Sequence, residues 1–176
     1  MQLPLDIDIQ ENQTLNNFCW RGNEILQNQI ELSLHENGER FFYISGQSGV
    51  GKSHTLQAIT HCIGSNSIYL PLEHLQDYGC DVFDGLDQLD VICLDNIEKI
   101  TGIKELEVAL FHLYNRIRDN NSSRLFIAGK EAISNLSIQL PDLRSRITWG
   151  LAFQLNELNE ECKLHVIEQQ AQSKGF

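Results

Sequence analysis

The sequence predicts an α/β fold in which a parallel sheet of five strands lies between two layers of helices. Three observations support this prediction. Short apolar segments alternate with segments of helical periodicity along the chain. The apolar segment 41–44 runs into a glycine-rich loop and then a helix, which is the setting of a phosphate-binding loop. The segment 91–94 is apolar without alternation, as in a strand buried on both faces.

Each expected strand is a short apolar segment that ends at turn residues. The first strand precedes the glycine-rich loop, the second ends at Pro71, the third runs into Asp95-Asn96 and the fourth ends at Gly129. In chain order, the expected strands are Phe41–Ser45, Ser67–Leu70, Val91–Leu94, Arg124–Ala128 and Leu151–Leu155.

The expected helices lie between these strands. The clearest is Lys104–Asn120, because apolar residues recur at helical spacing from position 106 to position 117. Asn159 is expected to cap the last helix, and Gly175 to end it. The segment 141–146 is expected to form a turn or a short helix. The other helices are expected at 23–36, from the glycine-rich loop to about 62, and around 73–78.

The loop after the first strand predicts a nucleotide site. Its residues follow the spacing G-x-x-x-x-G-K-[ST] and are Gly46-Gln47-Ser48-Gly49-Val50-Gly51-Lys52-Ser53, followed by His54. The glycines let backbone N–H groups turn towards an anion at a helix N-terminus. Lys52 can reach the β- and γ-phosphates, and the Ser53 hydroxyl can bind Mg²⁺. The alternative is a glycine-rich turn that binds nothing.

The end of the third strand predicts a second part of the same site. An aspartate at the carboxyl end of a buried parallel strand lies beside the phosphate loop in folds of this type. Asp95 is therefore expected to hold the Mg²⁺ shell, with Asn96 next to it. A surface turn is the alternative, because Asp-Asn is a common pair in turns.

Composition limits the possible partners. The 176 residues are enough for one domain with a core, and 13 basic against 24 acidic residues give a net charge of −11. Such an acidic chain is not expected to bind nucleic acid over a broad surface by itself; contact with DNA through a partner stays open. The five cysteines include no C-x-x-C pair, so reduced thiols are expected. With no signal peptide or apolar run of membrane length, a cytoplasmic protein without membrane contact is expected.

Residues 1–13 are expected to form an extended segment outside the nucleotide-binding domain, which covers 14–176. Pro4 and the lack of helical periodicity support this division. The sequence Gln2-Leu3-Pro4-Leu5-Asp6-Ile7 could place alternate apolar side chains into pockets on a partner. A disordered tail is the alternative.

Several stretches together resemble the Hda family, regulators that are related to the AAA+ domain of the bacterial initiator DnaA. The stretches are Thr14–Trp20, Gly51–Leu56, Val91–Glu98, Phe111–Ile117 and Leu140–Gly150. The resemblance implies a P-loop NTPase fold of the AAA+ type. The family's small helical lid is expected to be absent, because the chain stops about where the lid begins. The resemblance also implies that Gln2, Leu3, Leu5 and Ile7 bind the DNA polymerase III sliding clamp (its beta subunit).

The resemblance further implies a role in inactivating DnaA. Hda-family proteins carry ADP, are held on DNA-loaded clamp and promote hydrolysis of the ATP bound to DnaA. Arg146 matches the arginine-finger position of the family motif Ser-Arg-x-x-Trp-Gly. Such a finger acts in trans: its guanidinium would neutralise charge on the γ-phosphate of the ATP bound to the partner. The alternative is that Arg146 or Arg144 forms a surface ion pair with Asp142 or a neighbouring acid. A homodimer is a further assembly that an AAA+ interface would allow.

Two departures from active AAA+ ATPases predict weak or absent intrinsic hydrolysis. Asn96 replaces the second carboxylate and cannot accept a proton from water, although Glu98 lies two residues further along. Ala128 stands near the position of a polar residue that contacts the γ-phosphate in relatives. Bound ADP is therefore expected rather than ATP, with Phe18 near the base by resemblance. The alternatives are a small P-loop ATPase or kinase with its own substrate, and a DnaA-related adaptor without clamp contact.

Overall fold

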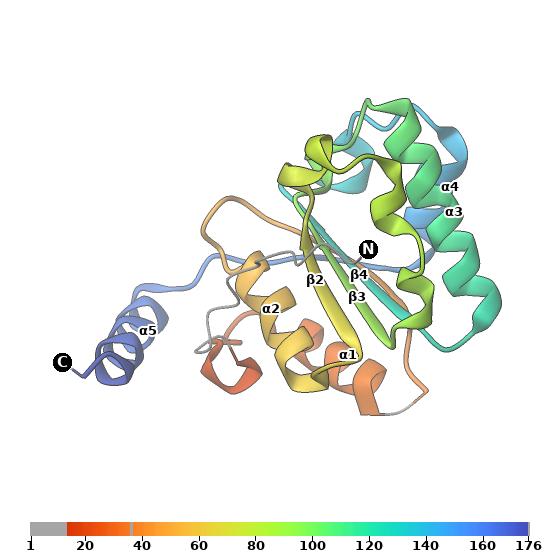
Figure 1. Cartoon of the computed structure of the whole chain (residues 1–176). Helices are drawn as coiled ribbons and strands as arrows, with labels where there is room; N and C mark the ends of the chain where they lie inside the picture. Colours follow the sequence, from red (N-terminus) through yellow and green to blue (C-terminus); the bar gives the residue numbers. More distant parts are fainter. Residues whose placement is uncertain (1–13, 36, 176) are drawn as a thin grey trace.

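The computed structural model describes residues 14–35 and 37–175, which form a parallel sheet with helices on both faces (Figure 1). The sheet has the strand order β2-β3-β4-β1-β5. Its strands are β1 (Phe41–Ser45), β2 (Ser67–Pro71), β3 (Val91–Asp95), β4 (Arg124–Gly129) and β5 (Leu151–Gln154). The helices are α1 (Glu24–His35), α2 (Lys52–Ile63), α3 (Lys104–Asn120), α4 (Pro141–Trp149) and α5 (Glu160–Ser173). Short 3₁₀ helices are η1 (Leu15–Asn17), η2 (Leu72–Asp77), η3 (Cys80–Phe83), η4 (Leu86–Gln88), η5 (Ile97–Lys99) and η6 (Ile133–Asn135).

The side chains of each strand point alternately to the two faces of the sheet, so the core consists of two clusters, one on each face. One cluster joins Tyr43 and Ile127 to apolar residues of α3 and α4. The other joins Phe42 and Phe126 to α1, α2 and the segment before α1. Because successive side chains of a strand point to opposite faces, each interior strand contributes to both clusters. This double burial explains why the strands are apolar without a polar face.

The carboxyl ends of three neighbouring strands meet at one edge of the sheet. β4 lies between β1 and β3, with Ser45 opposite Gly129 and Leu94 opposite Ile127 in the parallel register. The segments that follow these strands therefore leave the sheet side by side. They are the glycine-rich loop after β1, the turn at Asn96 after β3 and Lys130 after β4.

The expected elements agree closely with the observed ones, with two differences. The segment expected as a turn or short helix at 141–146 is the α-helix α4, which continues to Trp149. Pro141 begins it, and its fixed φ suits the first position of a helix. The segment around 73–78 is a 3₁₀ helix. The expected extended segment 1–13 lies outside the described residues.

A buried carboxylate holds α4 against α3. Glu107, on α3, is 1% exposed. Its two carboxylate oxygens accept hydrogen bonds from the backbone N–H groups of Gly102, Gln139 and Leu140 at 2.7 to 3.1 Å. The last two donors directly precede α4, so Glu107 fixes the point at which this helix starts.

We predict that Glu107→Ala lowers the free energy of unfolding by about 3 kcal/mol, because it leaves buried N–H groups without an acceptor. Urea denaturation followed by circular dichroism measures this loss. Glu105→Ala is the matched control, since Glu105 is exposed in the first turn of the same helix and its removal should cost less than about 1 kcal/mol. Equal stability of the two variants would contradict the role assigned to Glu107.

Candidate nucleotide-binding site

The glycine-rich loop joins β1 to α2 in a conformation that requires glycine. Gly49 and Gly51 have φ values of +85° and +105°, which residues with a Cβ rarely adopt. A Cβ on Gly51 would also lie 2.6 Å from Cε2 of Phe18. The loop delivers the chain to the first turn of α2, where backbone N–H groups have no partner within the helix. This is an anion-binding arrangement.

Lys52 begins α2 and folds back over the loop. Its ammonium group donates hydrogen bonds to the carbonyl oxygens of Gly46 at 2.6 Å and Gln47 at 2.7 Å. The residue is 7% exposed, and burial lowers the pKa of Lys52, while the carboxylates of Asp95 and Glu98 act to raise it. Its hydrogen bonds go to neutral carbonyls, and among the described residues it forms no ion pair within 4 Å, so Lys52 remains available to a phosphate.

Asp95 is fully buried where β3 ends. Its Oδ2 accepts hydrogen bonds from the Ser53 hydroxyl at 2.5 Å and from the Tyr69 hydroxyl at 2.7 Å, and its Oδ1 accepts one from the Asn96 N–H at 2.9 Å. Burial and the Asp95 charge raise the pKa of Tyr69, so this phenol stays protonated as a donor. These contacts fix the carboxylate against the hydroxyl of the phosphate loop.

The Ser53 and Asp95 oxygens fit a Mg²⁺ site. Mg²⁺ prefers oxygen ligands and typically takes one or two protein ligands, with waters and phosphate oxygens completing its shell. No cluster of three or more His, Cys, Asp or Glu side chains suited to a metal occurs in the described part of the chain. A nucleotide-borne Mg²⁺ does not need such a cluster, and it would neutralise phosphate charge at this position.

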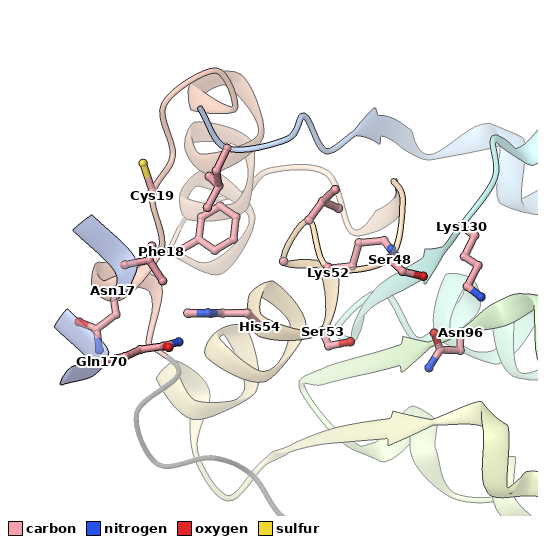
Figure 2. A pocket seen from close by; sticks show the side chains of 15 residues that line it. Asn17, Phe18, Cys19, Ser48, Lys52, Ser53, His54, Asn96, Lys130 and Gln170 are labelled. Carbon is pink, nitrogen blue, oxygen red and sulfur yellow. The ribbon is translucent and has the colours of Figure 1, made fainter. Parts of the chain in front are cut away.

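A cavity of about 410 Å³ opens beside the loop, a size typical of small-ligand sites. Its lining residues are Asn17, Phe18, Cys19, Ser48, Gly49, Val50, Gly51, Lys52, Ser53, His54, Asn96, Lys130, Leu158, Val166 and Gln170. Figure 2 shows two ends: a charged end with Ser48, Lys52, Ser53, Asn96 and Lys130, and an aromatic end with Asn17, Phe18, His54 and Gln170.

The aromatic end suits a planar base. The ring of Phe18 lies 4.4 Å from the ring of Trp20 and 5.4 Å, edge to face, from that of His54. Burial lowers the pKa of His54, which favours the neutral imidazole. Phe18, expected near the base by resemblance, lines this end of the cavity together with the apolar side chain of Val166. Flat apolar surfaces of this kind stack on nucleobases.

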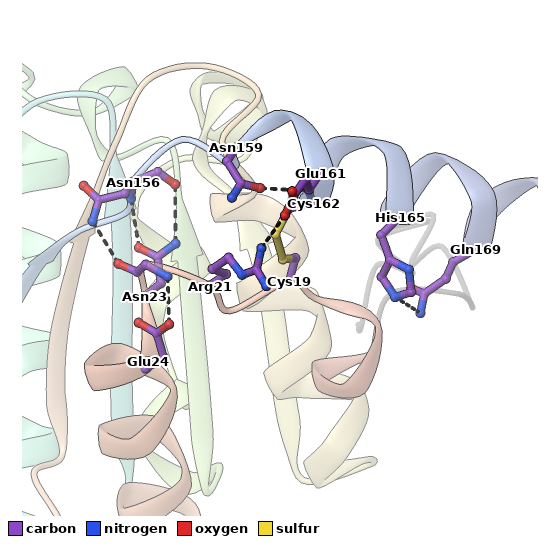
Figure 3. Close-up of a disulfide and its surroundings, with 11 residues drawn as sticks. Cys19, Arg21, Asn23, Glu24, Asn156, Asn159, Glu161, Cys162, His165 and Gln169 are labelled. Carbon is purple, nitrogen blue, oxygen red and sulfur yellow. Dashed lines mark hydrogen bonds and ion pairs between the residues drawn. A yellow bond between two sulfur atoms is a disulfide. The ribbon is translucent and has the colours of Figure 1, made fainter.

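Helix α5 forms one wall of the aromatic end and is fastened to the segment before α1 (Figure 3). Cys19 and Cys162 form a disulfide across 143 residues. Asn156 donates its N–H to Oδ1 of Asn23 at 2.9 Å. Arg21 and Glu161 form an exposed ion pair. The expectation of five reduced thiols is therefore wrong for Cys19 and Cys162. The fold brings the start of α5, which contains Cys162, next to the segment that contains Cys19, and the spacing of the cysteines in the sequence does not indicate this contact.

The charged end contains the two departures seen in the sequence. Asn96 lines the cavity and has left-handed backbone angles, φ 59° and ψ 51°. Ala128 is fully buried in the cluster that faces α1 and α2, so it offers nothing to a ligand. Glu98 lies close by in η5, where its Oε2 accepts the N–H of Lys130 at 3.3 Å. Its Oε1 is buried without a hydrogen-bond partner among the described residues.

The two arginines of α4 have different surroundings. Arg144 is structural: its guanidinium donates to four backbone carbonyls that precede the helix, those of Ile133, Ser134, Leu136 and Ile138. The guanidinium carbon of Arg146 lies 4.2 Å from the ring centre of Trp149 and 6.0 Å from that of Phe111. In the described part of the chain neither arginine forms an ion pair with Asp142, and Arg146 does not line the cavity.

Most of the sequence-predicted residues meet at the cavity. Ser48 to His54 and Asn96 line it, whereas Gly46, Gln47 and Asp95 act behind the lining through Lys52 and Ser53. The expected clamp-binding residues Gln2, Leu3, Leu5 and Ile7 lie outside the described residues. Sequence reasoning missed Lys130 and the α5 residues. Of these, only Lys130 could have been found from the sequence, because it directly follows a predicted strand whose end lies beside the glycine-rich loop.

The sequence is similar to those of known proteins. An uncharacterised protein of Haemophilus influenzae is 38% identical over 178 residues, which cover 99% of this chain and 77% of that protein. No protein-family profile matches the chain.

Solved structures establish the fold. Domain III of the replication initiation protein DnaA from Thermotoga maritima matches with a TM-score of 0.79 and 23% identity, over 93% of this chain and 75% of that one. AMPPCP-bound DnaA from Aquifex aeolicus matches with a TM-score of 0.76 and 21% identity, over 95% of this chain and 56% of that one. The chain thus spans little more than half of the second structure. The predicted α/β fold with a five-stranded parallel sheet is confirmed, and it is the fold of these DnaA structures. Within the described residues, no helix has the length and apolar character to cross a membrane.

We predict that alkylation of the chain, unfolded without reductant, labels three cysteines, Cys62, Cys80 and Cys93. Prior reduction should raise the number to all five, because it opens the Cys19–Cys162 bond. Intact-mass spectrometry counts the labels, and Cys62→Ser should remove one label under both conditions. Five labels without reductant would show that the two cysteines are not bonded.

Proposed function

The chain belongs to the same family as the uncharacterised Haemophilus influenzae protein, and we propose that it is a nucleotide-binding regulator of DNA replication initiation. The chain binds ADP or ATP with Mg²⁺ in the cavity and acts on DnaA rather than on a substrate of its own. Its Arg146 enters the nucleotide site of DnaA and stimulates ATP hydrolysis there. The position of Arg146, outside the cavity of its own chain and unpaired with Asp142, carries this proposal.

The residues of the cavity have separate roles in nucleotide binding. Lys52 and the N–H groups at the start of α2 bind phosphates, while Ser53 and Asp95 hold the Mg²⁺ ion. Asn96 can orient a water through its amide but cannot take its proton. Intrinsic hydrolysis is therefore weak or absent, and the bound nucleotide serves mainly to stabilise the surface that contacts the partner.

Arg146 is suited to act in another subunit. A guanidinium stacked on aromatic rings keeps its full charge, since no carboxylate neutralises it. Its helix is held in place by Arg144, which binds the preceding backbone, and by Glu107, which binds the helix start. Arginines supplied to the γ-phosphate in this way raise rates by about 10³ to 10⁵ in other NTPases.

The sliding clamp supplies contact with DNA in this proposal. The net charge of −11 disfavours direct binding to DNA, whereas a clamp loaded on DNA can recruit the chain through Gln2, Leu3, Leu5 and Ile7. Support for this step comes from the sequence pattern and its resemblance to clamp-binding peptides. A cytoplasmic location follows from these partners.

We predict that wild-type protein stimulates ATP hydrolysis by DnaA on clamp-loaded DNA, and that Arg146→Ala reduces this stimulation at least 100-fold. Arg146→Lys should recover little of it, because an ammonium group lacks the planar fork of a guanidinium. Release of labelled phosphate from DnaA-bound ATP is the measurement. The nucleotide affinity of the regulator itself should not change.

Arg118→Ala is the matched control for loss of one positive charge. Arg118 pairs with the exposed Asp119 at the end of α3, a contact that contributes little, so this variant should stimulate normally. Equal stimulation by Arg146→Ala and wild type would refute the trans arginine. Turnover of ATP by the regulator alone, at a rate independent of DnaA, would favour a P-loop ATPase or kinase instead.

The double variant Gln2→Ala/Leu5→Ala tests recruitment by the clamp. We predict a loss of binding to purified clamp of at least tenfold in surface plasmon resonance, because both anchor side chains are removed. Stimulation of DnaA should fall on clamp-loaded DNA but stay unchanged in the absence of clamp. Undiminished clamp binding by the variant would indicate an adaptor that does not use this peptide.

A further inference from the structure

Helix α5 forms a wall of the cavity although little of its surface is buried. Cys162 is 5% exposed and is the one buried residue among the described side chains of this helix, whereas Leu164 and Ile167 are each 61% exposed. Figure 1 shows α5 apart from the sheet and from the helices that cover it. Val166 and Gln170 nevertheless line the aromatic end of the cavity. The position of this wall therefore depends on few contacts.

The Cys19–Cys162 disulfide is the covalent contact between the two sides of the aromatic end (Figure 3). Cys19 directly follows Phe18, and both residues line the cavity. Cys162 lies in the first turn of α5, four residues before Val166. Because residues four apart lie on one face of a helix, the bond holds Val166 on the side of the helix that faces the segment of Phe18.

The polar contacts near the start of α5 restrain the helix less. Arg21 and Glu161 form an ion pair whose side chains are 62% and 81% exposed, and such pairs contribute little. Asn23 and Asn156 are joined by two hydrogen bonds, at 2.9 and 3.4 Å, but Asn156 precedes the helix. Opening the disulfide would therefore remove the strongest restraint that the described residues place on this wall.

We propose that the Cys19–Cys162 bond controls how tightly the cavity holds a nucleotide. The oxidised chain keeps α5 against the base, and the reduced chain lets the helix move away. The proposal rests on the proposed nucleotide binding and adds redox regulation of the same cavity. Coupling of this kind is reciprocal: a nucleotide that binds the oxidised chain more tightly also protects the bond from reduction.

A dithiol reductant supplies the two electrons that open the bond. Cys19 is half-buried and lines the cavity, whereas Cys162 is buried, so a thiolate of the reductant attacks the sulfur of Cys19. The sulfur of Cys162 leaves as a thiolate in the first turn of α5, where the helix N-terminus stabilises negative charge, and takes up a proton. The second thiol of the reductant then displaces Cys19 as a thiol, and the reductant becomes a disulfide. The reverse exchange closes the bond.

The experiment compares the binding of ADP with Mg²⁺ to the oxidised chain and to the chain reduced with dithiothreitol, by isothermal titration. We expect about tenfold weaker binding after reduction. By reciprocity, saturating ADP should lower the reduction potential of the bond by about 30 mV, which is tenfold for a two-electron couple. Thermal melting verifies that both forms are folded at the temperature of the titration.

Cysteine variants separate this bond from other effects of the reductant. Cys19→Ser/Cys162→Ser should bind ADP as weakly as reduced wild type, with or without dithiothreitol. Cys62→Ser is the matched control, because Cys62 is an exposed free thiol outside the cavity, and it should keep the tenfold difference between the two forms.

A second pair of variants tests whether α5 carries the effect. Val166→Ala should weaken ADP binding about threefold in the oxidised chain, because it removes apolar contact with the base, and should have no effect in the reduced chain. Leu164→Ala is its control, since Leu164 lies on the same helix but does not line the cavity; it should change neither affinity.

Each other result contradicts a definite part of the proposal. Equal affinity of the oxidised and reduced chains would overturn the redox control and leave nucleotide binding intact. An equal effect of Val166→Ala on both forms would show that α5 does not move when the bond opens. Unfolding of the reduced chain at the temperature of the titration would assign the bond to stability instead. Failure of the oxidised chain to bind ADP would overturn the proposed function and this inference together.

Discussion

The site depends on the buried carboxylate of Asp95 and on the hydroxyl groups that bind it. A charge at the end of a core strand is costly unless donors surround it, and here Ser53, Tyr69 and the N–H of Asn96 provide them. Ser53 belongs to α2, Tyr69 to β2 and Asn96 to the turn after β3. The same contacts that stabilise the charge therefore hold the phosphate loop, the sheet and the left-handed turn in one arrangement. The proposed nucleotide binding depends on this arrangement.

A second buried carboxylate organises a different surface. Glu107 fixes the start of α4 through three backbone N–H groups, and Arg144 binds the carbonyls of the segment that leads into that helix. Together they place Arg146 over Trp149 on α4. This helix packs in the core cluster that contains α3, on the face of the sheet opposite α1 and α2. The molecule thus separates the candidate nucleotide cavity from an arginine that lies outside it. This separation suits a protein whose chemistry is completed by a neighbouring subunit.

The sequence predicted those features that arise from local patterns. Apolar periodicity located the strands and α3, and the spacing of Gly46 to Ser53 together with the position of Asp95 located the charged end of the cavity. The Cys19–Cys162 bond and the wall formed by α5 were not predictable, because they depend on how a distant segment returns to the cavity. The continuation of α4 to Trp149 was missed because few of its residues are apolar; it is held by Leu143, Ile147 and polar contacts to the backbone.

The residues at the charged end favour retention of a nucleotide over its turnover. Rapid hydrolysis requires a group that takes a proton from water, and the turn after β3 presents Asn96 instead. Glu98 retains a carboxylate nearby, but it accepts the N–H of Lys130, and its other oxygen is buried away from solvent. Burial of that oxygen limits its access to a water at the γ-phosphate. If the cavity binds a nucleotide as proposed, the lack of an accessible base would let it hold this ligand for long periods. Such retention is what the proposed function requires of a nucleotide that maintains a protein surface.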